Sequence, residues 1–269
     1  MNFDQRRSRF RTLHESGAFL IPNPHDIGSC RLLASLGFPA LATTSGGFAA
    51  SLGRMDMTVS REELVGHVSA LVASTDLPIS VDAERCFPES PGGVVTTIEL
   101  LAEAGAAGCS VEDWDPAAAR IEDIGAASER VQAASAEADR HGMVLTARAE
   151  NHLRGVDDVD DTVRRLSAYR DAGAHAVYAP GLTDLRSIAR IVDETAAPVN
   201  VLLMPGGPST DELQSIGVRR LSVGSSLARI AYGALVQAAE DLLGGGSLQE
   251  AWPYLDRDRA QAAFASPKP

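Results

Sequence analysis

The segment Pro78-Ile-Ser-Val-Asp-Ala-Glu84 is a short apolar run that ends in carboxylates, and Gly108-Cys-Ser-Val-Glu-Asp113 repeats this pattern 30 positions later (108 minus 78). Apolar runs of this length are typical of buried strands in a parallel sheet. If the two strands are neighbours, up to four negative charges gather at one end of the sheet. Like charges at close range disfavour one another's ionisation unless a cation lies among them. The pattern therefore predicts a hard divalent metal ion at this end.

The rest of the chain alternates between strand-like and helix-like segments. Six further apolar runs lie at residues 19–22, 40–44, 143–147, 174–178, 198–203 and 219–223. Between the runs are amphipathic segments, which include 62–74, 94–103, 124–140 and 160–172. Eight runs in about 250 residues predict an α/β fold of the (β/α)₈ TIM barrel type. No Gly-x-Gly-x-x-Gly follows a strand, so an open dinucleotide-binding sheet is disfavoured.

The chain divides at a glycine-rich joint. Residues 1–243 are expected to form one barrel domain, and 244–269 to form a linker, Gly244-Gly-Gly-Ser247, followed by a helix and a tail. The helix-like segment runs from Leu248 to Phe264 and carries apolar residues, so it should pack on another surface. A partner subunit is one candidate for that surface.

Composition excludes several function classes. A net charge of −12 in 269 residues argues against nucleic acid or an anionic membrane as the main partner. The only lysine is Lys268 in the tail, so neither Schiff-base nor P-loop chemistry is available. The three cysteines show no Cys-x-x-Cys spacing, and no apolar window reaches 18 residues, which predicts a cytoplasmic protein.

In a barrel, functional side chains follow the carboxyl ends of the strands. A shell of Asp and Glu oxygens with waters selects Mg²⁺ or Mn²⁺. Ser45-Gly46-Gly47 offers a hydroxyl and open backbone amides to an anionic oxygen, or forms only a tight turn. Arg148 can bind a carboxylate or phosphonate in a bidentate fork, or pair with Glu150 or Glu112 as a structural salt bridge. Asn200 could reach the same pocket from its strand.

Five stretches of the sequence, taken in this order, resemble the isocitrate lyase/phosphoenolpyruvate mutase superfamily from about Phe19 to about Leu243: PNPHDIGSCRLLASLGFPALATTSGGFAASLGRMD, LPISVDAE, AAGCSVED, LTARAEN and PVNVLLMPGG. The resemblance implies a barrel that is usually tetrameric, with a terminal helix exchanged between subunits. It also implies a Mg²⁺-bound 2-oxo acid whose C–C or C–P bond is made or broken through an enolate-type intermediate.

The resemblance also assigns roles by position. Asp82 would be the direct metal ligand, and Glu84 and Glu112 would hold metal-bound waters. The substrate-binding residues would be Ser45, Gly46, Gly47, Arg148 and Asn200, and the catalytic residues Asp56, Arg148 and Glu112. Two carboxylates also have a purely structural interpretation: Asp113 can be a helix cap, and Asp56 can be a solvated loop residue.

The chain departs from the superfamily at two places. The lyases carry a Lys-x-Cys-Gly-His loop after the Glu-Asp strand, whereas residues 114–121 here contain no Lys, Cys or His. After Glu84 the usual glycine-rich turn is replaced by Arg85-Cys-Phe-Pro88, which predicts a bulkier pocket wall with an extra cation. The missing lyase loop disfavours isocitrate and methylisocitrate cleavage. The gating loop of phosphonate-handling members is shortened in the same region, which disfavours a mutase as well.

Three functions compete after these departures. The first is Mg²⁺-dependent C–C cleavage of a small, oxaloacetate-like 2-oxo acid by a lyase or hydrolase. The second is a C–P enzyme of the phosphonopyruvate mutase or hydrolase type. The third is a non-catalytic barrel that binds a keto acid.

Overall fold

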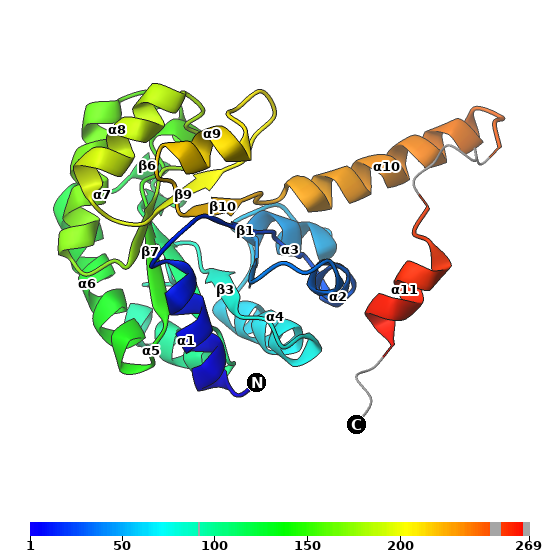
Figure 1. The fold of residues 1–269 in the computed structure, drawn as a ribbon, viewed down its shortest axis with the longest axis horizontal. Coiled ribbons are helices and arrows are strands. Elements are labelled where there is room, and N and C mark those ends of the chain that lie inside the picture. Colours follow the sequence, from blue (N-terminus) through cyan, green and yellow to red (C-terminus); the bar gives the residue numbers. More distant parts are fainter. Residues whose placement is uncertain (91, 248–253, 266–269) are drawn as a thin grey trace.

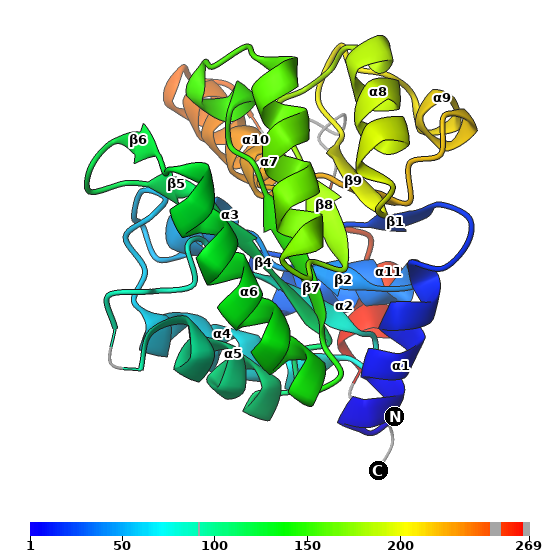
Figure 2. The same ribbon diagram turned by 90° about the vertical axis from the view of Figure 1, so that its left-hand side faces the viewer.

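The computed structural model describes residues 1–90, 92–247 and 254–265. Its central sheet has eight parallel strands in the order β1-β10-β9-β8-β7-β4-β3-β2 (Figures 1 and 2). The strands are β1 (Phe19–Ile21), β2 (Leu41–Ala42), β3 (Ile79–Asp82), β4 (Gly108–Glu112), β7 (Val144–Arg148), β8 (Ala176–Tyr178), β9 (Val199–Leu202) and β10 (Arg220–Ser222). Between β2 and β1, the Ala42 N–H donates to the Pro22 carbonyl over 3.1 Å, so the sheet is a nearly closed (β/α)₈ barrel. The predicted fold class is confirmed.

Helices lie around the barrel, at its amino-terminal end and beyond it (Figures 1 and 2). They are α1 (Phe3–Leu13), α2 (Ile27–Ser35), α3 (Ser45–Ser51), α4 (Arg61–Ser74), α5 (Gly93–Glu103), α6 (Ile124–Arg140), α7 (Val159–Asp171), α8 (Leu185–Thr195), α9 (Thr210–Ser215), α10 (Ser226–Leu243) and α11 (Arg257–Phe264), with a 3₁₀ turn η1 (His152–Arg154). A two-stranded hairpin, β5 (Trp114–Asp115) with β6 (Arg120–Ile121), follows β4. Capping side chains fix where several helices begin. Ser60 and Glu63, for example, form a capping box at the start of α4. The sequence patterns did not predict the hairpin.

Alternate residues of each strand face the inside of the barrel, and in this protein several of these inward-facing residues are polar. Arg220 on β10 donates to the hydroxyls of Thr146 on β7 and Ser80 on β3, and these three strands are not neighbours in the sheet. The bonds therefore cross the inside of the barrel. Two residues further along β3 and β10, Asp82 and Ser222 line a cavity. Layers of hydrogen-bonding side chains thus replace the usual branched apolar filling.

Helix α1 closes the amino-terminal end of the barrel. Its Phe10 is fully buried and packs in a small apolar cluster with residues at the starts of strands, which include Phe19 and Val144. Gly108 makes room for this ring, since a Cβ there would lie 2.8 Å from the Phe10 Cε1 atom. The site is therefore open only at the carboxyl ends of the strands.

The carboxyl-terminal helices lie outside the barrel. Helix α10 projects away from it, and α11 returns beside α2 of the same chain (Figure 1), where Arg31 Nη1 donates to the Phe264 carbonyl over 3.4 Å. The predicted helix 248–264 is shorter, because Tyr254 and Leu255 are not helical and residues 248–253 lie outside the described ranges. Exchange of a helix between subunits and the domain division at residue 243 stay predictions. None of the helices described is long and apolar enough to cross a membrane.

Candidate active site

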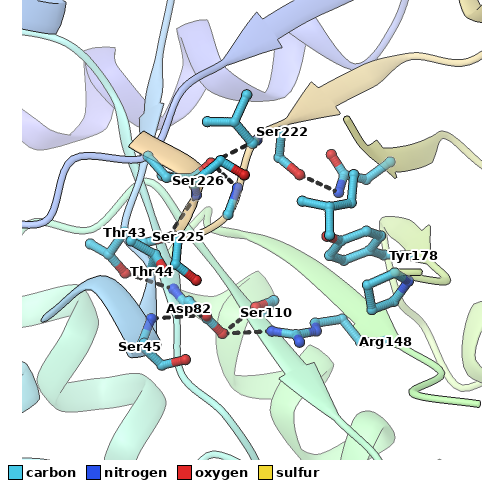
Figure 3. Close-up of a pocket in the computed structure, with 18 of the residues that line it drawn as sticks. Thr43, Thr44, Ser45, Asp82, Ser110, Arg148, Tyr178, Ser222, Ser225 and Ser226 are labelled. Atoms are coloured by element: carbon cyan, nitrogen blue, oxygen red, sulfur yellow. Dashed lines mark hydrogen bonds and ion pairs between the residues drawn. The ribbon is translucent and has the colours of Figure 1, made fainter. Parts of the chain in front are cut away.

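A cavity of about 290 Å³ lies at the carboxyl ends of the strands (Figure 3). All eight strands of the barrel contribute residues to it, either from the strand or from the loop after it. Polar lining residues include Asn23, Thr43, Thr44, Ser45, Asp56, Asp82, Ser110, Arg148, Tyr178, Asn200, Arg220, Ser222, Ser225, Ser226 and Arg229. The volume has room for roughly ten water-sized groups, which suits a small organic acid.

Asp82 lies at the centre of the site and is held on both oxygens. Its Oδ1 accepts from Arg148 Nη1 over 2.7 Å, and its Oδ2 accepts from the Ser45 N–H over 3.1 Å. The Ser110 hydroxyl lies 3.5 Å from Oδ1, and the Asp82 N–H donates to the Thr43 hydroxyl. Figure 3 shows Arg148, Ser45 and Ser110 around the Asp82 carboxylate. Asp82 is therefore fixed in position before any ligand binds.

Arg148 is enclosed by carboxylates of the protein itself. Besides Asp82, its Nη2 lies 3.0 Å from Glu112 Oε2 and 2.8 Å from Glu150 Oε1, and its Nε donates to Glu150. Both glutamates are buried, and the Tyr178 ring lies 5.5 Å from the guanidinium. The salt-bridge alternative for Arg148 thus describes this structure. Its bidentate fork faces protein carboxylates, and substrate binding by Arg148 stays a prediction.

Glu84 and Glu112 lie near the cavity but outside its lining. Burial raises the pKa of Glu84 to about 8, and the charges of Asp82 and Asp56 add to the shift. Burial also raises the pKa of Glu112 well above its usual range despite the adjacent Arg148, and its Oε1 has no hydrogen-bond partner. The carboxylates predicted from the two strand ends therefore interact electrostatically, while only Asp82 reaches the cavity directly.

The carboxylates around Asp82 fit the predicted hard cation if one of them binds it directly and the others bind its waters. Within the described ranges, no three His, Cys, Asp or Glu side chains converge closely enough to coordinate one ion directly. Mg²⁺ usually keeps several waters and takes only one or two protein carboxylates. This coordination preference is compatible with Asp82 as the direct ligand and with Glu84 and Glu112 bound to metal waters. Arg148 already pairs with Asp82 and Glu112, so the charge that a further cation would offset is that of Glu84, whose pKa burial and the neighbouring carboxylates raise.

The Ser45-Gly46-Gly47 segment divides into two parts. Ser45 and Gly46 line the cavity, and a Cβ on Gly46 would lie 3.1 Å from the Asp56 Oδ2 atom, so a larger residue there would push Asp56 away by a few tenths of an ångström. Gly47 is buried outside the lining, and its N–H donates to the Thr44 hydroxyl at the start of α3. We therefore remove Gly47 from the proposed substrate-binding set and keep Asp56 in the site.

With this geometry established, comparison with known proteins places the chain. Residues 10–243 match the phosphoenolpyruvate phosphomutase family. The chain belongs to that family. In the solved structure of a candidate lyase/mutase from Burkholderia cenocepacia J2315, the matched chain is 45% identical, with a TM-score of 0.93 over 98% of this chain and 97% of that one.

Curated relatives are similar to this chain over most of their length. An uncharacterised protein of Mycobacterium tuberculosis is 29% identical over 92% of this chain and 93% of its own length. An oxaloacetate decarboxylase of Bradyrhizobium diazoefficiens is 28% identical over 74% of this chain and 71% of its own. Other relatives are 2-methylisocitrate lyases. The predicted superfamily, and an enzyme of the lyase or mutase class, are therefore confirmed.

In this member of the family, the segment after Glu84 does not put an extra cation into the pocket. Arg85 turns away and pairs with Glu122, with Glu89 at 2.7 Å and with Asp115 at 3.4 Å, so it fastens the β5–β6 hairpin. The prediction of a basic pocket wall is wrong, because Arg85 pairs with acids on and beside the hairpin, Asp115 and Glu122, and does not line the cavity. Cys86 is fully buried, and burial raises the pKa of its thiol, so it is unreactive.

Asp113 is structural rather than a ligand. It is 1% exposed, and its Oδ2 accepts from the Tyr169 hydroxyl over 2.7 Å and from Arg165 over 3.2 Å. Its Oδ1 accepts from the Glu150 N–H over 2.9 Å. Asp113 therefore ties the end of β7 to helix α7, and by this means it positions Glu150 beside Arg148.

Several cavity residues were missed by reasoning from the sequence. Strand alternation would have indicated Ser110 and Ser222, which stand two residues from Glu112 and Arg220 on the inward face. Arg229, one turn into α10, gave no local signal. Only the closure of the barrel brings the first residues of this helix to the cavity rim.

The backbone at Glu84 is strained, and we expect this to affect stability. Glu84, with φ of 51°, is the first of three non-glycine residues in this segment in the left-handed region. In buffer containing a metal chelator, Glu84→Gly should raise the free energy of unfolding by roughly 1–2 kcal/mol, because it relieves backbone strain and removes a buried, repelled carboxylate. Urea titration measures the change.

A matched control separates strain from charge. Ala119 has φ of 49° on the exposed turn of the β5–β6 hairpin, so Ala119→Gly relieves strain alone and should gain less, about 0.5 kcal/mol. A Glu84→Gly protein less stable than the wild type would contradict this account of the segment.

Proposed function

We propose that this protein is a Mg²⁺- or Mn²⁺-dependent lyase or hydrolase that cleaves a C–C bond in a small, oxaloacetate-like 2-oxo acid through an enolate intermediate. The observation that carries the proposal is the central position of Asp82. It is held between Ser45 and Arg148 in a polar cavity at the carboxyl ends of the strands, where its charge acts on the nearby Glu84 and Glu112. The similarity to an oxaloacetate decarboxylase supports the choice of substrate class.

In this proposal Asp82 holds the divalent ion, with Glu84 and Glu112 acting on its waters. A divalent ion bound there would polarise the 2-oxo group and favour the negative charge that develops during cleavage. Arg148 keeps Asp82, Glu112 and Glu150 in one arrangement and limits their repulsion. The acidic cluster is thereby ready to accept a cation without rearrangement.

The remaining lining residues bind and orient the substrate. Ser45 supplies a hydroxyl, and the neighbouring Gly46 allows close approach beside Asp56. Asn200 is 2% exposed, donates from Nδ2 to the Ser222 hydroxyl and keeps an unpaired Oδ1 in the cavity wall. Asp56, at the mouth, can hold or move a proton at the reacting end of the substrate.

Phosphonate chemistry is the second candidate. The family that the chain matches takes its name from a phosphomutase, and a solved candidate phosphonomutase from Burkholderia cenocepacia J2315 is 32% identical to this chain with a TM-score of 0.82. Against it, the segment after β4 is a short hairpin fastened by Arg85 and Arg130 through Glu122. A hairpin held in this way is poorly suited to close over a transferring phosphonyl group.

We also propose that the protein is a homo-oligomer. Helix α10 leaves the barrel and exposes Ile230, Leu235, Val236 and Leu243 along its length. Apolar side chains on a projecting helix are costly in water, and a second copy of the chain would cover them. Sedimentation or light scattering would determine the number of subunits.

A panel of 2-oxo acids tests the proposed reaction. Oxaloacetate, its methylated analogues and phosphonopyruvate are each incubated with the protein and Mg²⁺, and parallel samples contain EDTA. We expect pyruvate or oxalate from a C4 acid with Mg²⁺, and at least about a hundredfold lower rate with EDTA. Phosphate release from phosphonopyruvate would favour the second candidate, and oxalate binding without turnover of any acid would identify a binding protein.

A further inference from the structure

Arg220 lies at the bottom of the cavity, deeper than Asp82. It is 5% exposed, and Nη1 donates to the Thr146 hydroxyl over 2.9 Å while Nη2 donates to the Ser80 hydroxyl over 3.3 Å. On the other side, its guanidinium lies 5.8 Å from the ring of Phe10, which closes the barrel. The side chain therefore has a fixed position between the apolar plug and the ligand cavity.

Arg220 forms no ion pair with any of the described residues, and the charge of Asp82 acts on it only from a distance. Among the residues described, no carboxylate lies within 4.0 Å of its nitrogens, and its Nε has no hydrogen-bond partner. Arg148, by contrast, contacts three carboxylates. Burial lowers the pKa of Arg220 to about 10, which still leaves it positive at neutral pH. A buried cation bonded only to hydroxyls is costly, and a bound anion would offset that cost.

The depth of Arg220 suits one end of a small dianion. Ser80, its partner on β3, stands two residues before Asp82, so the two layers are about 6–7 Å apart along the strand. Asn200, opposite Arg220 in the β9–β10 register, has an unpaired amide oxygen in the same wall. A ligand held near Asp82 can therefore extend a second anionic group toward Arg220.

We propose that Arg220 forms the floor of an anion subsite that takes one carboxylate of a dianionic 2-oxo acid or of oxalate. The choice of ligand rests on the proposed function, whereas the subsite itself rests on the buried, uncompensated guanidinium. The subsite makes the protein selective for diacids over monoacids of similar size. Because hydroxyls hold the guanidinium rigidly, it binds the anion without reorganisation.

Calorimetric titration with oxalate in the presence of Mg²⁺ tests the subsite. Arg220→Met removes the charge and keeps similar volume, and it should weaken oxalate binding by at least about tenfold. Arg219→Met removes the same charge from the neighbouring residue, which contacts the Gly17 carbonyl at the surface, and should change binding less than about twofold. Pyruvate binding, which needs one carboxylate only, should respond much less to Arg220→Met.

The outcomes separate this inference from the proposed function. A folded Arg220→Met protein with unchanged oxalate affinity overturns the subsite, and so does a wild type that does not bind oxalate. Oxalate binding that depends on Arg220, without turnover of any 2-oxo acid, overturns the proposed reaction alone. If Arg220→Met does not fold, Thr146→Val removes one anchor of the guanidinium and should weaken oxalate binding at least about threefold, while unchanged affinity overturns the subsite.

Discussion

Asp82→Ala is expected to lower kcat/KM for cleavage of the 2-oxo acid by at least about 10³-fold. The carboxylate lies at the centre of the cavity and is the only one of the three proposed acidic ligands that lines it. Without it, the charge that develops in the transition state loses its main electrostatic support. Product release from oxaloacetate, followed with and without Mg²⁺, measures the effect.

Asp82→Asn is the matched variant, because it keeps the shape and one acceptor oxygen but removes the charge. It should retain the fold, shown by an unchanged urea transition, and lose nearly as much activity as Asp82→Ala. Turnover that survives either change in the presence of EDTA would refute the mechanism proposed for this site. The urea transition is the necessary control, because Asp82 also pairs with Arg148 and its loss can affect stability.

Arg148→Met is expected to destabilise the protein by about 3–5 kcal/mol. Arg148 compensates Asp82, Glu112 and Glu150, the last two of which are 3% and 0% exposed. Removing one partner of a buried ionic network leaves uncompensated charge, which costs far more than losing a surface pair. Urea unfolding at neutral pH, with the slope checked for constancy, gives the difference.

A double variant tests the cause of this loss. Arg148→Met combined with Glu150→Gln removes one of the stranded carboxylate charges and should recover roughly 1–2 kcal/mol of the lost stability. An Arg148→Met protein as stable as the wild type would show that the three carboxylates do not depend on this guanidinium. Arg148 would then be free to bind substrate, as the family resemblance implies.

Strand ends were the most informative part of the sequence. The runs that finish in Asp82 and Glu112 gave the correct strands, their place in the barrel and the location of the cavity, because a strand buried on both faces needs a continuous apolar run. Ser45 and Asn200 also line the cavity, as their positions at a strand end and on a strand predict. Asp56 lines it too, but only the family resemblance had placed it near the reacting end.

Ion pairs between residues that are distant in sequence could not be predicted from strand ends. Whether Arg85 enters the pocket or holds the hairpin depends on Glu122, which lies 37 positions away, and on how the β5–β6 hairpin folds back. Asp113 and Glu112 are adjacent in sequence but face opposite sides of the strand. One therefore belongs to the structure around α7 and the other to the charged network at the site.

The sequence by itself determined the eightfold alternation of strands and helices, the face on which function lies and the acidic character of the site. Each of these depends on local apolar patterning and on residue types at strand ends. Only the tertiary structure decided which charges are neutralised. Closing the barrel brings Arg148 to three carboxylates and leaves Arg220 with hydroxyls alone, because electrostatic energy depends on distance and burial in space rather than on separation along the chain.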